Sequence, residues 1–347
     1  MTSLQPLRLV VMGTGPFAVP MFRALRESHH RIEAVVTRPD RVAAGRRPPP
    51  NPMREAALAA GVPILAPDRI NDDEAIDMLA RLAPDLFVVC DYGQILSPRV
   101  LGLAPLGGIN LHGSLLPRHR GAAPIQWSIL EGDPITGVSV IHMTPALDAG
   151  NVIVARAAPI YPGDTAPALE AHLADLGAGA TLEAIERLDA ARAIHKPGEP
   201  LQIGVPQDAG KATRAPRLSK ADGLVHWEWP APRIERMRRA LEPWPRTTAF
   251  LERAGGEPLR LVLDDVAVDT DHADQATRAQ PGTILAAGDA GIVVACGAAT
   301  ALAIRRMVPE GRRGMTAAEF LRGSPILPGM RFSGAARIES GSPKSSP

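Results

Sequence analysis

Residues 7–18 read Leu7-Arg8-Leu9-Val10-Val11-Met12-Gly13-Thr14-Gly15-Pro16-Phe17-Ala18, a short apolar strand that leads through two glycines into a helical pattern. Apolar runs and helical patterns continue to alternate over the first 192 residues. The expected strands are Leu7–Met12, Ile32–Thr37, Ile64–Ala66, Leu86–Cys90, Gly108–His112, Gly137–His142 and Val152–Pro159. The expected helices are Phe17–Glu27, Pro52–Ala60, Glu74–Leu82, Pro124–Leu130 and Ala166–Arg192. Strands that are apolar throughout and alternate with helices predict an α/β fold, with a mainly parallel sheet covered on both faces.

The pattern changes after residue 195. Prolines and glycines without periodicity fill residues 196–213, which we interpret as a linker. The strands expected beyond the linker are Leu224–Trp229, Thr247–Glu252, Leu259–Val268, Thr283–Ala286, Ile292–Cys296 and Ala301–Arg306, with one helix at Arg233–Leu241. Short strands with glycine-rich turns predict a small β-barrel or sandwich over residues 214–335. Residues 336–347, rich in Ser, Gly and Pro, are expected to form a disordered tail.

Composition excludes several classes of protein. The 347 residues are 45% hydrophobic and 22% charged, and 38 Lys and Arg against 37 Asp and Glu leave a net charge of +1. These values are typical of a globular protein and exclude a uniformly basic nucleic-acid binder. The two cysteines lack metal-ligand spacing and are too few for a disulfide framework. Together with the lack of a membrane-length apolar run, this predicts a cytoplasmic protein.

The glycine turn allows two interpretations. Gly13, Gly15 and Ala18 satisfy the dinucleotide-binding pattern G-x-G-x-x-G/A, and Glu33 stands near the expected acidic position. However, Pro16 lacks the N–H that would help to bind a pyrophosphate. A purely structural turn between strand and helix is about as well supported by this motif alone.

A more specific group of residues lies further along the chain. Asn110 and His112 alternate on an expected strand, so both side chains point to the same face near its carboxyl end, where open α/β sheets bind ligands. An amide and an imidazole at that edge can stabilise a negatively charged oxygen and carry a proton. Asp148 follows another strand of the same unit, on a turn that contains Gly150. Each residue taken alone is more typical of a structural position.

These residues belong to longer motifs that resemble the 10-formyltetrahydrofolate-dependent formyltransferases. The resemblance extends over about residues 7–330. The matching stretches are Asn110-x-His112-x-Ser114-Leu115-Leu116-Pro117-x-x-Arg120-Gly121-Ala122-Ala123-Pro124, Leu147-Asp148-x-Gly150, Pro39-Asp40-Arg41, Tyr92-Gly93-x-Ile95-Leu96, Leu218-Ser219-Lys220-x-Asp222-Gly223 and Pro243-Trp244-Pro245. The match is greatest with the members of this family that act on methionine carried by initiator tRNA.

The resemblance implies a Rossmann-like formyltransferase domain followed by a small barrel similar to an OB-fold. It also implies that the glycine turn is structural. The implied reaction transfers a formyl group from 10-formyltetrahydrofolate, without a metal, to the α-amino group of methionyl-initiator tRNA. The implied catalytic residues are Asn110, His112 and Asp148, and we expect Asp148 to favour the imidazolium form of His112. We also expect a monomer.

The resemblance further implies which residues contact folate. They are Tyr92, Gly93, Ser114, Leu115, Leu116 and Pro117. The chain departs from the family at two nearby positions. Asp91 stands where a small residue is common, and Ala149 replaces the usual Thr of the Leu-Asp-Thr-Gly turn. The first departure leaves open whether a carboxylate helps or hinders folate binding.

Two concentrations of basic residues are candidates for tRNA phosphate contacts. Residues 38–54 contain five arginines and one acid, and residues 211–250 contain nine Lys and Arg against four acids. Phosphate contacts of this kind fix a nucleic acid without reading its sequence. The residues predicted to bind tRNA are Arg41, Arg46, Arg47, Lys211, Lys220, Arg238 and Arg239.

Three alternatives remain at this point. One is a formyltransferase that acts on a sugar amine, or a formyl-folate hydrolase, with the same Asn-His-Asp chemistry. Another is a dehydrogenase that binds NAD at the glycine turn. The third is a catalytically inactive tRNA-binding protein, which the intact Asn110, His112 and Asp148 disfavour.

Overall fold

The computed structural model describes residues 6–40, 51–192, 201, 203–253 and 256–333. Its described residues form two compact units. The first extends to Arg217, and the second contains the residues from Leu218 on together with the short segments 129–133 and 162–167. The domain boundaries at residues 195 and 214 stay predictions, and the expected tail at 336–347 lies outside the described residues. Within the described part of the chain, no helix has the length and apolar character needed to cross a membrane.

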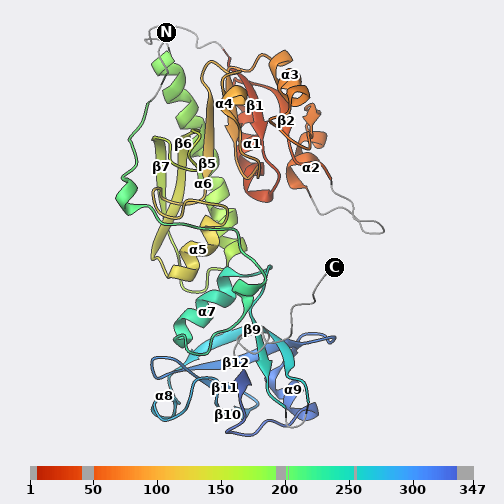
Figure 1. Cartoon of the computed structure of the whole chain (residues 1–347), viewed down its shortest axis with the longest axis vertical. Helices are drawn as coiled ribbons and strands as arrows, with labels where there is room; N and C mark the ends of the chain where they lie inside the picture. Colours follow the sequence, from red (N-terminus) through yellow and green to blue (C-terminus); the bar gives the residue numbers. More distant parts are fainter. Residues whose placement is uncertain (1–5, 41–50, 193–200, 202, 254–255, 334–347) are drawn as a thin grey trace, which may run out of the picture. The chain divides into compact units, whose positions relative to one another are not determined.

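The first unit is built on a seven-stranded sheet with the order β3-β2-β1-β4-β5-β6-β7 (Figure 1). Strands β1 to β5 run parallel to one another, β6 runs antiparallel to β5, and β7 pairs antiparallel with β6, so that only β6 is reversed. The strands are β1 (Arg8–Met12), β2 (Arg31–Val36), β3 (Ile64–Leu65), β4 (Leu86–Val89), β5 (Gly108–His112), β6 (Ile135–His142) and β7 (Val152–Pro159). The prediction of a mainly parallel sheet is therefore confirmed. Every residue of β4 is buried, as expected for a strand covered on both faces.

Helices follow the strands as the alternating pattern predicted. They are α1 (Val19–Glu27), α2 (Pro52–Ala59), α3 (Asp73–Arg81), α4 (Pro98–Leu101), α5 (Pro124–Glu131) and α6 (Ala166–Arg192). Ile76 of α3 and Val100 of α4 share a buried cluster with Phe87 and Val89 of β4, so these two helices cover one face of the sheet. Gly177 lets α6 approach Leu111 of β5 closely, because a Cβ at this glycine would lie 2.7 Å from a Leu111 methyl carbon.

The second unit is a curled antiparallel sheet with the order β10-β11-β12-β9-β8-β14, and β13 pairs with β12. Its strands are β8 (Thr248–Leu251), β9 (Leu259–Asp269), β10 (Ile284–Gly288), β11 (Gly291–Cys296), β12 (Thr300–Pro309), β13 (Met315–Thr316) and β14 (Phe332–Ser333). Its helices are α7 (Ala231–Ala240), α8 (Ala273–Ala276) and α9 (Ala317–Gly323). The pairing of β9 with β12 shifts register near Ile304 and Arg306, and bulges of this kind bend a sheet. The prediction of a small barrel-like domain is confirmed.

One predicted strand of this unit is wrong. Residues 224–229 form turns and a single bridge between Leu224 and Thr248 in place of a β-ladder. The side chains of this segment still alternate in burial, because Val225 and Trp227 enter the core while His226 and Glu228 stay exposed. A segment of turns whose side chains alternate in burial thus gives the same sequence pattern as a strand.

Candidate active site

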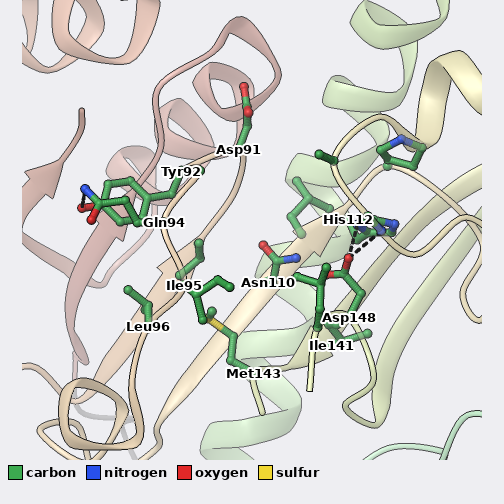
Figure 2. A pocket seen from close by; sticks show the side chains of 18 of the residues that line it. Asp91, Tyr92, Gln94, Ile95, Leu96, Asn110, His112, Ile141, Met143 and Asp148 are labelled. Atoms are coloured by element: carbon green, nitrogen blue, oxygen red, sulfur yellow. Dashed lines mark hydrogen bonds and ion pairs between the residues drawn. The ribbon is translucent and has the colours of Figure 1, made fainter. Parts of the chain in front are cut away.

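A pocket of about 500 Å³ opens at the carboxyl end of the parallel strands, and the first unit alone lines it. Figure 2 shows that its walls differ in character. Ile95, Leu96 and Met143 form an apolar side, and Asn110, His112 and Asp148 gather on the other side. A pocket of this size with a few converging polar groups is typical of a small-molecule site.

Strand alternation places Asn110 and His112 together, as the sequence predicted. Asn110 pairs in register with Val89 of β4, so its side chain lies on the face that α3 and α4 cover. Leu111 points to the opposite face, against α6. Among the residues that the structure describes, no group forms a hydrogen bond with the Asn110 amide. Its N–H groups are therefore available to a ligand in the pocket.

His112 is almost completely buried, with 5% of its side chain exposed. Its Nε2 lies 2.9 Å from the backbone oxygen of His119. Because a carbonyl oxygen only accepts, Nε2 carries the proton of that bond. The other ring nitrogen, Nδ1, lies 3.8 Å from Oδ2 of Asp148.

Burial lowers the pKa of His112 below its ordinary value, and the nearby carboxylate of Asp148 opposes this shift. The desolvation cost of an imidazolium is therefore larger than the attraction of Asp148. Asp148 favours the imidazolium form, as expected, but burial outweighs this effect and lowers the pKa of His112 overall. With its proton on Nε2, the neutral ring presents Nδ1 as a bare proton acceptor.

The turn after β6 holds Asp148 in an unusual backbone conformation. Its φ is +50°, in the left-handed region that residues with a side chain adopt rarely. Oδ2 of Asp148 accepts a hydrogen bond of 2.9 Å from the N–H of Gly121, and only 8% of the side chain is exposed. Gly150 packs directly on the backbone oxygen of His142, where no Cβ fits. The turn is therefore fixed at both its ends.

The structure brings some of the predicted folate contacts to this pocket. Tyr92 and Gly93 line it. The Tyr92 ring points away from Asn110 and His112, and its hydroxyl accepts a hydrogen bond from Gln94 (Figure 2). Burial raises the pKa of Tyr92 to about 12, so this hydroxyl stays neutral. Tyr92 therefore offers the pocket mainly its backbone.

The predicted contacts from Ser114 to Pro117 lie elsewhere. None of these four residues lines the described pocket. The Ser114 hydroxyl donates to the backbone oxygen of Arg118, and the N–H of Leu116 donates to the hydroxyl of Ser139. These bonds shape the loop after β5. A direct folate contact by this segment stays a prediction.

Asp91 lies in the pocket wall, close against the glycine turn. Burial raises the pKa of the Asp91 carboxyl group. The N–H of Gly15 and the guanidinium groups of Arg38 and Arg217 oppose this shift. Glu170, which sequence reasoning missed, also lines the pocket, and burial together with Asp91 raises its pKa. Two carboxyl groups and Arg217 thus line this part of the pocket, and Arg38 acts on Asp91 from outside the lining.

The same arrangement disfavours a pyrophosphate at the glycine turn. A Cβ added to Gly15 would overlap Oδ2 of Asp91, so a carboxyl group already fills the space beside the turn. Glu33 is occupied as well, by ion pairs with Arg8 at 3.1 Å and Arg31 at 3.6 Å. The turn is therefore structural, in agreement with the implication of the resemblance.

The predicted tRNA-binding residues differ in availability. Arg41, Arg46 and Arg47 lie outside the described residues. Lys211 and Lys220 are exposed, although Lys211 lies 3.6 Å from Asp208. The last two predicted residues, Arg238 and Arg239, are on α7 and have partners within the second unit. Nε of Arg238 donates to the backbone oxygen of Asp264.

Arg239 is the least available of these residues. Its side chain is 10% exposed, and its guanidinium donates to both carboxylate oxygens of Glu235 and to the backbone oxygen of Asp164. Three hydrogen bonds in a buried position leave little capacity for a phosphate. Arg239 is therefore a poor candidate for a phosphate contact.

Comparisons with known proteins agree over both units. A family model described as "Formyl transferase" matches residues 7–185, and one described as "Formyl transferase, C-terminal domain" matches residues 217–325. The methionyl-tRNA formyltransferase of Rhodopirellula baltica is 43% identical over 334 residues, which are 94% of this chain and 96% of that protein. That of Desulfotalea psychrophila is 41% identical over 321 residues, 92% of this chain and 94% of that protein.

Among solved structures, HypX from Aquifex aeolicus in complex with tetrahydrofolic acid has a similar fold. The match has a TM-score of 0.55 at 16% sequence identity, over 91% of this chain and 47% of that chain. At this identity, the likeness concerns the fold alone.

Proposed function

Because the chain belongs to the formyltransferase family, we propose that it transfers the formyl group of 10-formyltetrahydrofolate to the α-amino group of methionyl-initiator tRNA. The observation that carries the reaction class is the group of Asn110, His112 and Asp148 at the wall of an open pocket, where the side chains of His112 and Asp148 are buried. The choice of acceptor is supported by relatives named methionyl-tRNA formyltransferase that match nearly the whole chain, including the second unit.

The pocket fits a folate in size and chemistry. Its volume of about 500 Å³ lies in the range of sites for drug-sized molecules. The apolar side chains of Ile95, Leu96 and Met143 suit a flat ring system, and the polar side begins at Asn110. A folate would supply the formyl carbon, whose oxygen gains negative charge as an amine adds to it.

Asn110 would stabilise that oxygen. Its amide is a neutral donor without a partner among the described residues, and it is fixed on β5 before a ligand arrives. A preorganised donor of this kind favours the charge that develops in the transition state.

His112 would move the proton of the amine. The neutral ring accepts a proton at Nδ1 and becomes an imidazolium opposite the Asp148 carboxylate, 3.8 Å away. The proton can then pass to the nitrogen that leaves. The Nε2–H bond to the backbone of His119 keeps the ring in one orientation throughout.

The direct test measures formyl-methionyl-tRNA formed from 10-formyltetrahydrofolate and charged initiator tRNA. Uncharged tRNA and free methionine serve as controls, and we expect product only with the charged tRNA. Formylation of a sugar amine or another small amine, without formylation of charged tRNA, would contradict the proposed acceptor. Release of formate without any acceptor would indicate a hydrolase instead.

A further inference from the structure

One glutamine side chain connects the Asp148 turn to the segment that holds His112. Nε2 of Gln207 donates to the backbone oxygens of Asp148 and Gly150, both at 2.8 Å. Oε1 of Gln207 accepts from Nε and Nη2 of Arg120 at 3.1 and 2.7 Å. A guanidinium only donates and a carbonyl only accepts, so the orientation of this amide is fixed and both its ends are used.

We propose that Gln207 is a positioning residue for the reaction, which acts by holding Asp148 opposite His112. This inference rests on the proposed function. Gln207 lies 59 residues after Asp148 in the sequence, inside the segment 196–213 that its composition marks as a linker.

The need for such a restraint comes from the backbone. Asp148 has a φ of +50°, a conformation that persists only where surrounding groups hold it. Gln207 binds the carbonyls on both sides of Ala149, so it bridges the tightest part of the turn. Without these two bonds, the turn can relax toward ordinary backbone angles and carry the carboxylate away from His112.

The oxygen end of the Gln207 amide is also connected to His112 and Asp148, through Arg120 and its two neighbours in the sequence. His119 binds His112 through its backbone oxygen, and Gly121 binds Asp148 through its N–H. Arg120 lies between them, and its guanidinium is the group that Gln207 accepts from. Arg120 also pairs through its backbone with Thr213 and Ala215. Residues 207–215 therefore support the wall of the pocket from behind.

The charge of the side chain gives a sharp test. Gln207→Glu keeps the shape and the bonds from Arg120, but it places a carboxylate oxygen against two carbonyl oxygens. Gln207→Ala removes both ends of the bridge. We expect each variant to lower kcat about 10- to 100-fold with KM for both substrates within about twofold, because small displacements of a catalytic group have effects of this size. Gln280→Glu is the matched control, because Gln280 also accepts from an arginine, Arg331, but lies in the second unit and does not line the pocket.

A double-mutant cycle separates positioning from a general structural role. If Gln207 acts through Asp148, Gln207→Ala should cost almost nothing more in a chain that already carries Asp148→Asn. A loss of folded protein would instead lower activity by the same factor in both backgrounds. Equal factors in the two backgrounds, or a normal kcat for both Gln207 variants, would overturn the inference.

The proposed function is tested separately by the unaltered protein in the same assay. If this protein formylates an amine other than methionyl-tRNA, the proposed acceptor fails, and the cycle is measured on the amine that it does formylate. If it formylates methionyl-tRNA but the losses of kcat from Gln207→Ala and Asp148→Asn multiply in the double variant, only the role of Gln207 fails.

Discussion

Nδ1 of His112 faces Oδ2 of Asp148 at 3.8 Å, and less than a tenth of either side chain is exposed. This distance is too long for a hydrogen bond, so the two groups are not locked together in the free protein. A proton on Nδ1 would create an attractive ion pair in a poorly solvated place, where charges interact strongly. The arrangement therefore stabilises His112 most at the moment when it holds the proton of the amine.

The pH dependence of the reaction tests this relationship. Burial lowers the pKa of His112 and Asp148 raises it, so removal of the negative charge should lower this pKa further. His112 acts as a base only when it is neutral. The acid limb of the kcat profile should therefore move to lower pH in Asp148→Asn, together with a lower kcat at the plateau. An acid limb at the same or a higher pH would exclude His112 as the group that titrates.

Asn110 is the candidate donor to the formyl oxygen. Asn110→Ala removes it, and we expect kcat to fall about 10²- to 10³-fold, as for donors to a developing oxyanion in other enzymes. KM for folate and tRNA should change little, because the donor acts mainly in the transition state. Steady-state kinetics on both substrates check this. A raised KM with an unchanged kcat would show that Asn110 only binds substrate.

The exposed lysines Lys211 and Lys220 are predicted to contact tRNA phosphates. In the double variant Lys211→Gln/Lys220→Gln, KM for tRNA should rise, and its dependence on salt should become less steep because fewer counterions are released. KM for folate should respond less to salt. Arg99→Gln is the control, since Arg99 is exposed and pairs with Asp73 outside both basic groups. Equal effects of the two substitutions would count against a specific phosphate contact.

Buried histidines should make the folded protein sensitive to mild acid. Burial lowers the pKa of His30, His112 and His142, whereas the unfolded chain has the ordinary value near 6.5. Below that pH, the unfolded state binds more protons than the folded state, so the free energy of unfolding falls as pH falls. Urea unfolding between pH 7 and 5 should show this loss, and His142→Gln should make the slope smaller.

The matched control for that experiment is His172→Gln, at an exposed position of α6. It should leave the slope of stability against pH as it is in the unaltered protein. If His142→Gln and His172→Gln give the same slope, burial of His142 is not the cause.

Sequence periodicity was sufficient to predict helices with one continuous apolar stripe and strands that are buried along their whole length. α6 begins and ends at the residues that the sequence indicates, and β5 places Asn110 and His112 as strand alternation requires. Short elements defined by local bonds were missed. α9 begins with a capping box between Thr316 and Glu319, a pattern visible in the sequence but too short to carry an apolar stripe.

The protonation of the site and the position of its supports depend on contacts between distant segments. The net effect on the pKa of His112 is a balance between burial and Asp148, and a sequence shows neither the burial nor the distance. Gln207 has no local pattern that marks it, because its two partners come from segments 59 and 87 residues earlier. Composition alone made that stretch look like a connector.

Because β6 runs antiparallel to β5, the position of Asp148 depends on the number of residues between the end of β6 and Asp148. β6 leaves the sheet at His142, level with Ile109, whereas Asp148 must face His112 three residues further along β5. The five residues between His142 and Asp148 therefore carry the chain back by about 10 Å, at roughly 3.3 Å for each strand residue. They act as a spacer of set length. A deletion here would misplace the carboxylate even if every catalytic side chain were kept, so the evolutionary freedom of this family to gain or lose residues should lie elsewhere.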